Sequence, residues 1–456
     1  MGNASRLIWV LALSITLSAC GDSDQGIGAP TQLQAVGIKS QVHVSWVSWS
    51  PPSDGAVVAA YRVYRDDVEI GEVTTTSFVD ELPGDEECVT RQYTALAVDA
   101  DGNASPRSEP AASSLPLSNV IIMIGDGMGP EHERAAGCYL FGPDHGSDGS
   151  ELVFETLPVQ GQMTTYSANS DITDSAASAT AIATGHKVAN NVVSVANPGD
   201  ERDLYTILEC FADQGRATGL VTTTQISHAT PACFAAHQPV RLLQAAIVVD
   251  YLEEARPNVL FGGALHMTPE LAADAGYEAV TTRAELDALP DDTEFASGQF
   301  ASDHMPYEYD ATQTEDDPYD VIPHLHEMVT AALGRLEENP EGFFLLVEGG
   351  RIDHGGHENS IERNVLETVA FDEAVEAVLA WAQGRDDTLI VITADHETGG
   401  LDVVECNAAG DWPTVTWSTL DHTGVPVNTH AWGKNADRFG GTIDNTDFFT
   451  AISSGP

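Results

Sequence analysis

The sequence predicts an α/β fold in which a parallel sheet carries helices on both faces, preceded by a small all-β sandwich. Continuous apolar runs such as "NVIIMIG", "GFFLLVEGG" and "DTLIVITAD" are typical of strands that are buried on both faces. Helical patterns such as "VLETVAFDEAVEAVLAWA" alternate with these runs, as they do between parallel strands. Both features begin only near residue 119, and shorter alternating runs fill the segment before it. The chain therefore contains two domains of different class.

The first residues have the pattern of an export signal, which we assign to residues 1–19. Arg6 precedes the apolar run "LIWVLALSITL", which is too short to span a membrane. "LSAC" resembles the lipobox of bacterial lipoproteins, and Cys20 would then carry the lipid and provide the only membrane attachment. An ordinary signal peptide with an incidental cysteine is the alternative. In both cases the protein is exported, to the periplasm or cell surface of a bacterium, and residues 20–28 form a polar tether.

Residues 29–115 predict the all-β sandwich. Val, Tyr, Trp and Thr recur at alternate positions, as in "VHVSWVSW", and turn sequences separate the runs. The segment resembles a fibronectin type III domain, in which Trp46 and Trp49 compete for the core tryptophan position. Because it carries no catalytic constellation, we expect a spacer, with carbohydrate or surface binding as the alternative role. A linker at residues 110–119 leads into the second domain, residues 117–456.

The charge of the chain excludes some classes of partner. Seventy acidic residues against 19 basic residues give a net charge of −51. Such a surface repels nucleic acid and anionic lipid, so we expect no nucleic-acid-binding domain. The balance is typical of halophilic proteins, in which solvent ions screen the self-repulsion, and an acidic secreted protein is the alternative. The six cysteines permit disulfides after export, but their spacing does not fix the pairing.

Candidate metal ligands follow four of the predicted strands. Because parallel strands place their carboxyl ends at one edge of a sheet, we expect these side chains to converge. Like charges packed together need cations between them. Histidine and aspartate suit zinc, whereas an all-oxygen set suits magnesium, and the pool contains both kinds. In chain order the candidates are Asp126, His228, Thr230, Glu348, Asp353, His354, His357, Asp395 and His396.

Ser175 lies in "DITDSAASATAIATG", and this stretch by itself is ambiguous. Asp, Ser and Thr before an Ala-rich run are what the start of a helix requires, so Ser175 could be an ordinary cap. A helix N-terminus also favours an anion, which would suit a nucleophile that binds phosphate.

Six motifs occur in an order that resembles the alkaline phosphatase family. They are "IGDGMG", "ITDSAASAT", "SHATPA", "FFLLVEGGRIDHGGH", "TADHETGG" and "HTG", and the resemblance covers about residues 119 to 456. It implies hydrolysis of small phosphate monoesters through a phosphoserine intermediate, with two zinc ions and one magnesium ion. Carried onto this sequence, it makes Ser175 the nucleophile and Arg241, eleven residues beyond Thr230, the phosphate clamp.

The resemblance also implies three ligand sets. One zinc ion would take Asp353, His357 and His422. The other would take Asp126, Asp395 and His396. Magnesium would take Asp126, Thr230 and Glu348. His430 in "NTHAWG" competes with His422, and the family motif His-Thr-Gly favours His422.

Three further residues are expected to support the site. Asp174 would position Arg241 and would not act as a general base. His228 falls where some members have Asp, so it would act around the magnesium site or favour another metal there. His354 replaces a Lys of some members, which leaves phosphate affinity and metal preference open. Surface or packing roles are expected for His132, His145, His266, His324 and His326.

Other functions of the same domain fit these motifs less well. A phosphodiesterase or sulfatase of the superfamily typically uses Thr or a modified Cys as nucleophile and lacks the pair formed by Thr230 and Glu348. A surface-binding protein with a degenerate second domain would have lost ligands, and none is missing. The short interval between "ADHETGG" and "DHTG" predicts a small or absent accessory crown. Homodimers are common in the family, but no residue here decides between a monomer and a homodimer.

Overall fold

The computed structural model describes residues 28–38, 41–47, 57–82, 89–147, 149–290 and 292–454. The predicted export signal, Cys20, most of the tether and Trp49 lie outside these residues. The chain divides into two compact units, one made largely of N-terminal strands and one that contains the chain from Ala112 onward. Within the described ranges, no helix is long and apolar enough to cross a membrane.

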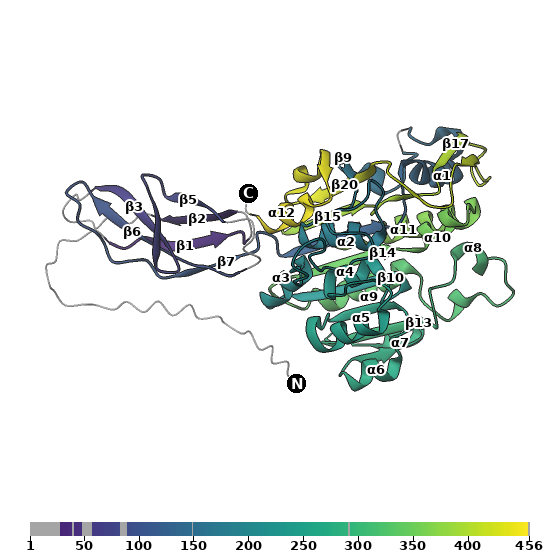
Figure 1. The fold of residues 1–456 in the computed structure, drawn as a ribbon, viewed down its shortest axis with the longest axis horizontal. Helices are drawn as coiled ribbons and strands as arrows, with labels where there is room; N and C mark the ends of the chain where they lie inside the picture. The colour runs from purple at the N-terminus through teal and green to yellow at the C-terminus, as the bar shows by residue number, and fades with distance from the viewer. Residues whose placement is uncertain are drawn as a thin grey trace, which may run out of the picture. The chain divides into compact units, whose positions relative to one another are not determined.

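The N-terminal strands form an all-β element, as the alternating pattern predicts (Figure 1). Their spatial order is β4-β3-β6-β7-β1-β2-β5. Trp46 is buried and packs edge-on against Tyr61, with 5.2 Å between the ring centroids, so it occupies a core position. The strands are β1 (Thr31–Val36), β2 (Gln41–Val47), β3 (Val58–Arg65), β4 (Val68–Val73), β5 (Ser77–Glu81), β6 (Gln92–Asp99) and β7 (Ala111–Ser114). The fibronectin type III class of this element stays a prediction.

A large mixed sheet forms the centre of the second unit, in the order β12-β13-β11-β10-β14-β8-β15-β20-β9-β21. From β12 to β15 every neighbouring pair is parallel, which confirms the predicted parallel sheet over its central part. Beyond β15 the sheet differs, because β20 runs antiparallel to both β15 and β9. The strands are β8 (Asn119–Gly125), β9 (Val159–Thr164), β10 (Ala217–Gln225), β11 (Val259–Gly263), β12 (Glu278–Val280), β13 (Ala296–Ala301), β14 (Phe343–Gly349), β15 (Thr388–Thr393), β20 (Val427–Gly433) and β21 (Gly441–Asp444).

Helices cover both faces of this sheet, which confirms the predicted fold class (Figure 1). Neighbouring residues of a strand point to opposite faces. Phe344 of β14 meets Phe211 of α3 and Phe234 of α4, whereas Phe343 meets Trp381 of α11. The helices are α1 (Pro130–Phe141), α2 (Ser175–Thr184), α3 (Ile207–Asp213), α4 (Ala229–Ala235), α5 (Gln244–Asp250), α6 (Pro269–Asp274), α7 (Arg283–Ala288), α8 (Glu308–Ala311), α9 (Leu325–Leu336), α10 (Arg351–His357), α11 (Ile361–Ala382) and α12 (Asp447–Ser453).

Two small antiparallel sheets lie in the connection from β15 to β20. β16 (Glu397–Thr398) pairs with β19 (His422–Thr423), and β17 (Leu401–Glu405) pairs with β18 (Thr414–Trp417). A disulfide between Cys138 of α1 and Cys406 anchors the β17–β18 hairpin. The connection therefore returns the chain on the carboxyl side of β15 without a crossover helix, which is why β20 enters the sheet antiparallel.

Candidate active site

Four neighbouring strands bring the predicted ligands to one edge of the sheet. β10, β14, β8 and β15 are adjacent in that order, and their carboxyl ends carry His228, Glu348, Asp126 and Asp395 in turn. Gly127 follows β8 with φ +72°, and a Cβ there would lie 2.8 Å from the Cα of Asp353. Glycine therefore lets the loop after β8 approach α10 closely. This approach places Asp126 beside the ligands that α10 carries.

Asp353, His357 and His422 form the first candidate metal group. Oδ1 of Asp353 lies 3.3 Å from Nε2 of His357 and 3.5 Å from Nε2 of His422, and the two Nε2 atoms are 3.1 Å apart. Asp353 and His357 are four residues apart on α10, so the helix presents them on one face. Three potential ligand atoms thus surround one point.

The other ring nitrogens fix how these two histidines face each other. Nδ1 of His357 lies 2.5 Å from the carbonyl oxygen of Leu420, and Nδ1 of His422 lies 3.0 Å from that of Thr173. A carbonyl only accepts, so each Nδ1 donates, and the Nε2 atoms of both rings face the same point. Partners on the second ring nitrogen are what orient histidines that bind a metal ion, so this arrangement fits a cation between the two rings and Asp353.

Asp126, Asp395 and His396 form the second group, and all three are fully buried. Nε2 of His396 lies 3.5 Å from Oδ1 of Asp126 and 3.3 Å from Oδ2 of Asp395. Oδ1 of Asp395 accepts from the amides of Gly127 and His396, at 3.1 and 3.0 Å. Among the described residues, Oδ2 of Asp395 and both carboxylate oxygens of Asp126 have no hydrogen-bond partner. Buried carboxylate oxygens without partners are costly unless a cation satisfies them.

The pKa values of this group reflect the same crowding. Burial, followed by the charges of Asp395 and Asp353, raises the pKa of Asp126 well above its usual range. Burial raises the pKa of Asp395 to about 6. Burial also raises the pKa of Asp353, but the neighbouring histidines outweigh it and hold that pKa below its ordinary value. Asp126 and Asp395 thus resist ionisation beside each other. A divalent cation bound between them would offset the repulsion between the two carboxylates and would favour their ionised forms.

Thr398, which the sequence reasoning missed, connects the two groups. Its hydroxyl lies 2.5 Å from Oδ1 of Asp353 and 3.2 Å from Nδ1 of His396. The carboxylate can only accept, so the Thr398 hydroxyl donates to Asp353 and accepts a hydrogen bond from Nδ1–H of His396. Nε2 of His396 therefore carries its lone pair toward Asp126. The signal for this residue was its position in "ADHETGG", two residues after His396.

The third group contains Asp126, Glu348 and His228, whose candidate ligand atoms lie within 4.8 Å of one another. The Thr222 and Thr224 hydroxyls hold Oε2 of Glu348, whereas its Oε1 has no partner. Oγ1 of Thr230 is buried beside the same carboxyl group and has no other partner in the described part of the chain. Burial raises the pKa of Glu348 to about 7. Both His228 and Thr230 therefore offer an atom to this group.

Ser175 is the first residue of α2 and is 2% exposed. The Asp174 side chain caps the helix by accepting from the amide of Ala177 at 3.1 Å, and Gly185 ends the helix with φ +76°. Oγ of Ser175 lies 3.3 Å from Nε2 of His396, beside the second group. The serine hydroxyl thus lies at a helix N-terminus and faces the buried carboxylates.

Arg241 lies between the helix start and the third group. Its Nη1 donates to Oδ2 of Asp174 at 3.1 Å, and its Nη2 lies 3.2 Å from Nε2 of His228. Oδ1 of Asp174 also accepts from the amide of Asn191, at 3.0 Å. Asp174 thus contacts the predicted clamp, and its side chain does not contact Ser175 within the described hydrogen bonds.

His304 is a second residue that the sequence reasoning missed. The ring centroids of His304 and His354 are 4.6 Å apart, and each lies within 5.7 Å of the His228 ring. Burial, then the charge of Arg351, lowers the pKa of His304 to about 4. The residue comes three positions after the end of β13, so a strand assignment for "ASGQFA" would have placed it at this edge.

The remaining histidines lie in other surroundings. His430 is buried on β20 with its Nε2 3.4 Å from Oε2 of Glu133, and it belongs to none of the three candidate groups in the described chain. His145 pairs with Glu155 and His324 with Glu308, each at 3.0 Å. His132 is fully buried, and burial lowers its pKa to about 4.

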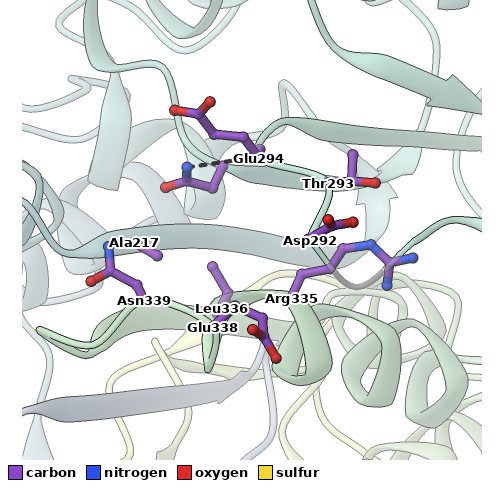
Figure 2. A pocket seen from close by; sticks show the side chains of 9 residues that line it. Ala217, Asp292, Thr293, Glu294, Arg335, Leu336, Glu338 and Asn339 are labelled. Atoms are coloured by element: carbon purple, nitrogen blue, oxygen red, sulfur yellow. Dashed lines mark hydrogen bonds between the residues drawn. The ribbon is translucent and has the colours of Figure 1, made fainter. Parts of the chain in front are cut away.

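A polar pocket of about 350 Å³ lies away from this cluster (Figure 2). Ala217 begins β10, Asn258 precedes β11 and Asn339 precedes β14, so the pocket lies at the amino ends of the strands. Ligands of open parallel sheets bind at the opposite, carboxyl edge. Arg335 in its wall donates to backbone carbonyls, among them that of Leu289 at 2.9 Å. The pocket contains none of the predicted site residues.

The geometry of this edge agrees with the comparisons to known proteins. A model of the alkaline phosphatase family matches residues 117–260 and 262–413. The chain belongs to the alkaline phosphatase family. It is 35% identical to alkaline phosphatase 3 of Bacillus subtilis (strain 168) over 329 residues, which are 68% of each protein.

Solved alkaline phosphatases share the fold of the second unit. The cold-active alkaline phosphatase of a psychrophilic Shewanella species is 31% identical, with a TM-score of 0.66 over 74% of this chain and 98% of that one. A variant of TAB5 alkaline phosphatase with magnesium in its M3 site is 27% identical, with a TM-score of 0.62 over 74% of this chain and 97% of that one. The present alkaline phosphatase is accordingly a phosphoric monoester hydrolase of a metal-dependent family.

Proposed function

We propose that this alkaline phosphatase hydrolyses small phosphate monoesters through a covalent phosphoserine at Ser175. The observation that carries the proposal is the position of the Ser175 hydroxyl, 3.3 Å from Nε2 of His396 and next to buried carboxylate oxygens that lack partners. A serine held at a helix N-terminus beside a cation site has the surroundings that activate a nucleophile toward phosphorus.

The donor sets fit two zinc ions and one magnesium ion. Asp353, His357 and His422 would hold one zinc ion, since two nitrogens and a carboxylate are typical of zinc. Asp126, Asp395 and His396 would hold the second, and Asp126 would also serve the third site. There, Glu348 and Thr230 would supply oxygen to magnesium. Bound cations would supply positive charge that favours the serine alkoxide and the departing alcohol oxygen.

The protein's own groups perform the remaining tasks. The Arg241 guanidinium, oriented by Asp174, would bind two non-bridging phosphate oxygens and hold phosphorus in front of Ser175. Oγ of Ser175 would form a bond to phosphorus as the bond to the alcohol oxygen breaks. A water molecule would then attack the phosphoserine, releasing phosphate and restoring the serine. His354 and His228 would line the phosphate side of the site, where their low pKa values keep the rings neutral.

The context of the enzyme belongs to the same proposal. The protein is exported to the periplasm or cell surface of a bacterium, either with a lipid at Cys20 or after cleavage of an ordinary signal peptide. Residues 29–115 act as a fibronectin type III-like spacer, and residues 117–456 act as the catalytic domain. A homodimer is compatible with the proposal.

Ser175→Ala tests the nucleophile. We expect the release of phosphate from an aryl phosphate to fall at least a thousandfold while the metal content of the purified protein stays that of the wild type. Acid quenching during turnover should trap phosphate on the wild-type peptide that contains Ser175 and on none from the variant. Ser178→Ala, one turn further along α2, is the matched control and should keep its activity. Near-wild-type turnover by Ser175→Ala would refute the assignment.

A further inference from the structure

Three exposed apolar side chains belong to the segments that hold the proposed active site. Ile172, Leu420 and Val425 are exposed to 43%, 60% and 45%. Ile172 comes three residues before Ser175, and the other two lie within three residues of His422. Single exposed apolar residues are ordinary, but their grouping beside a reaction centre indicates a ligand surface.

Backbone contacts bring these residues to the Asp353–His357–His422 group. Nδ1 of His422 donates to the carbonyl of Thr173, the neighbour of Ile172, at 3.0 Å. A Cβ at Gly424 would lie 3.9 Å from Cγ1 of Ile172, so the loop that leads to Val425 passes beside Ile172. The carbonyl of Leu420 accepts from His357. The segments that hold the two histidines therefore also present the apolar side chains, which we call the apolar rim (Ile172, Leu420 and Val425).

The proposed reaction gives this rim a position relative to the substrate. Ser175 attacks from the His396 side, and attacking and leaving oxygens are roughly in line across phosphorus. The alcohol therefore departs on the side of Asp353, His357 and His422, where the rim lies. Arg241 takes the non-bridging oxygens and is held by Asp174, so the rim faces the organic part of the ester.

The charges next to the rim disfavour an anionic alcohol. Asp171 and Asp421 are exposed and adjoin Ile172 and Leu420 in the chain. Exposed carboxylates beside the rim oppose a leaving group that is itself anionic, such as a phosphate or a carboxylate. The apolar rim favours a hydrocarbon group in the alcohol, and the two aspartates disfavour an alcohol that carries negative charge.

Resting on the proposed function, we infer that the enzyme prefers phosphate monoesters of apolar, uncharged alcohols and that the apolar rim binds the alkyl or aryl group. An alkyl chain that extends from the reaction centre toward the rim would cover Ile172, Leu420 and Val425 and remove their apolar surface from water. Since this contact exists in the transition state, it raises kcat/KM with chain length.

A series of n-alkyl phosphates from ethyl to octyl tests the inference, because leaving-group basicity changes little along it. We expect kcat/KM to rise roughly twofold to fourfold per methylene until the rim is covered. The double variant Ile172→Ser, Val425→Ser should flatten this slope. Leu271→Ser is the control, since Leu271 is exposed to 46% on α6, and its slope should match the wild type.

The possible results separate this inference from the proposed function. Hydrolysis of every ester with no dependence on chain length would overturn the inference and leave the proposed function intact. If the wild type hydrolyses none of the esters, the proposed function is contradicted. If the double variant keeps the wild-type dependence of kcat/KM on chain length, the inference is overturned. If light scattering also shows that the molar mass of the double variant in solution differs from that of the wild type, the rim is a contact between copies of the chain.

Discussion

Nη1 of Arg241 lies 3.1 Å from Oδ2 of Asp174, so the residue that caps the nucleophile's helix also holds the phosphate-facing guanidinium. The other oxygen of Asp174 accepts from the amides of Ala177 and Asn191. One carboxylate thus couples the start of α2 to the clamp. Movement of Arg241 relative to Ser175 would have to break this ion pair.

Replacing Asp174 by Asn should weaken phosphate binding more than it disturbs the helix. Asn remains a good N-cap, but it loses the charge that holds Arg241. We expect the inhibition constant for inorganic phosphate to rise about tenfold, as for the loss of a charge-assisted hydrogen bond. Inhibition kinetics with an aryl phosphate measure this. Asp171→Asn removes the same charge three residues earlier without touching Arg241, and an equal effect there would contradict the assignment.

Glu348→Gln should remove one bound metal ion and leave the other two. Oε1 of Glu348 is the oxygen without a partner, whereas the Thr222 and Thr224 hydroxyls hold Oε2. An amide is a poorer ligand for magnesium than a carboxylate. Elemental analysis after dialysis should therefore show about one metal equivalent fewer, with lower activity that excess magnesium partly restores. Unchanged stoichiometry at full activity would show that Glu348 holds no ion.

His237 should make the stability of the protein depend on pH. Burial lowers its pKa, but the hydrogen bond and charge of Glu209 outweigh burial and raise the pKa to about 9. A raised pKa gives stability that is complete below about 6.5 and is lost as the pH rises through about 9. We expect His237→Gln to lower the free energy of unfolding by roughly 1–3 kcal/mol at pH 6 and by less at pH 9.5.

Urea unfolding of metal-saturated protein at both pH values measures this difference. Glu209→Gln is the matched control, because Gln can keep the N-terminal capping contact of α3 while removing the charge beside His237. Its loss of stability should have the same pH dependence. A His237→Gln effect that is equal at pH 6 and pH 9.5 would contradict the charged pair.

The disulfide between Cys138 and Cys406 should protect the first metal group. It anchors the β17–β18 hairpin, which lies in the chain between His396 and His422. Tyr139 of α1 stacks on Trp412 of the same hairpin at 4.5 Å, so α1 supports this insertion at two points. We expect the double variant Cys138→Ser, Cys406→Ser to lose about 2–4 kcal/mol of unfolding free energy and to release zinc faster to a chelator.

If the double variant is less stable but releases zinc at the wild-type rate, the disulfide stabilises the fold without holding His422 in place.

The central strands could be predicted because each is a continuous apolar run that ends in a ligand, as with "NVIIMIG" before Asp126. β13, by contrast, contains Ser, Gly and Gln in six residues, so neither the strand nor His304 beyond it was recognised. The antiparallel direction of β20 depends on the path of the preceding connection and not on its own composition. The Cys138–Cys406 pairing has a sequence separation of 268 residues, and no local pattern specifies such a contact.

Salt should stabilise this protein more than an ordinary secreted enzyme. The net charge of −51 arises from 70 acidic and 19 basic residues, so the acidic surface repels itself in the folded state. The Debye length falls from about 10 Å at 0.1 M salt to about 3 Å at 1 M, which screens that repulsion between side chains. We therefore expect the melting temperature of metal-saturated protein to rise steeply between low and molar KCl. Sucrose at equal osmolality, which leaves charges unscreened, is the control and should give a smaller rise. Equal melting temperatures at low and molar KCl would refute the halophilic interpretation, because repulsion among the carboxylates would then contribute nothing measurable to stability.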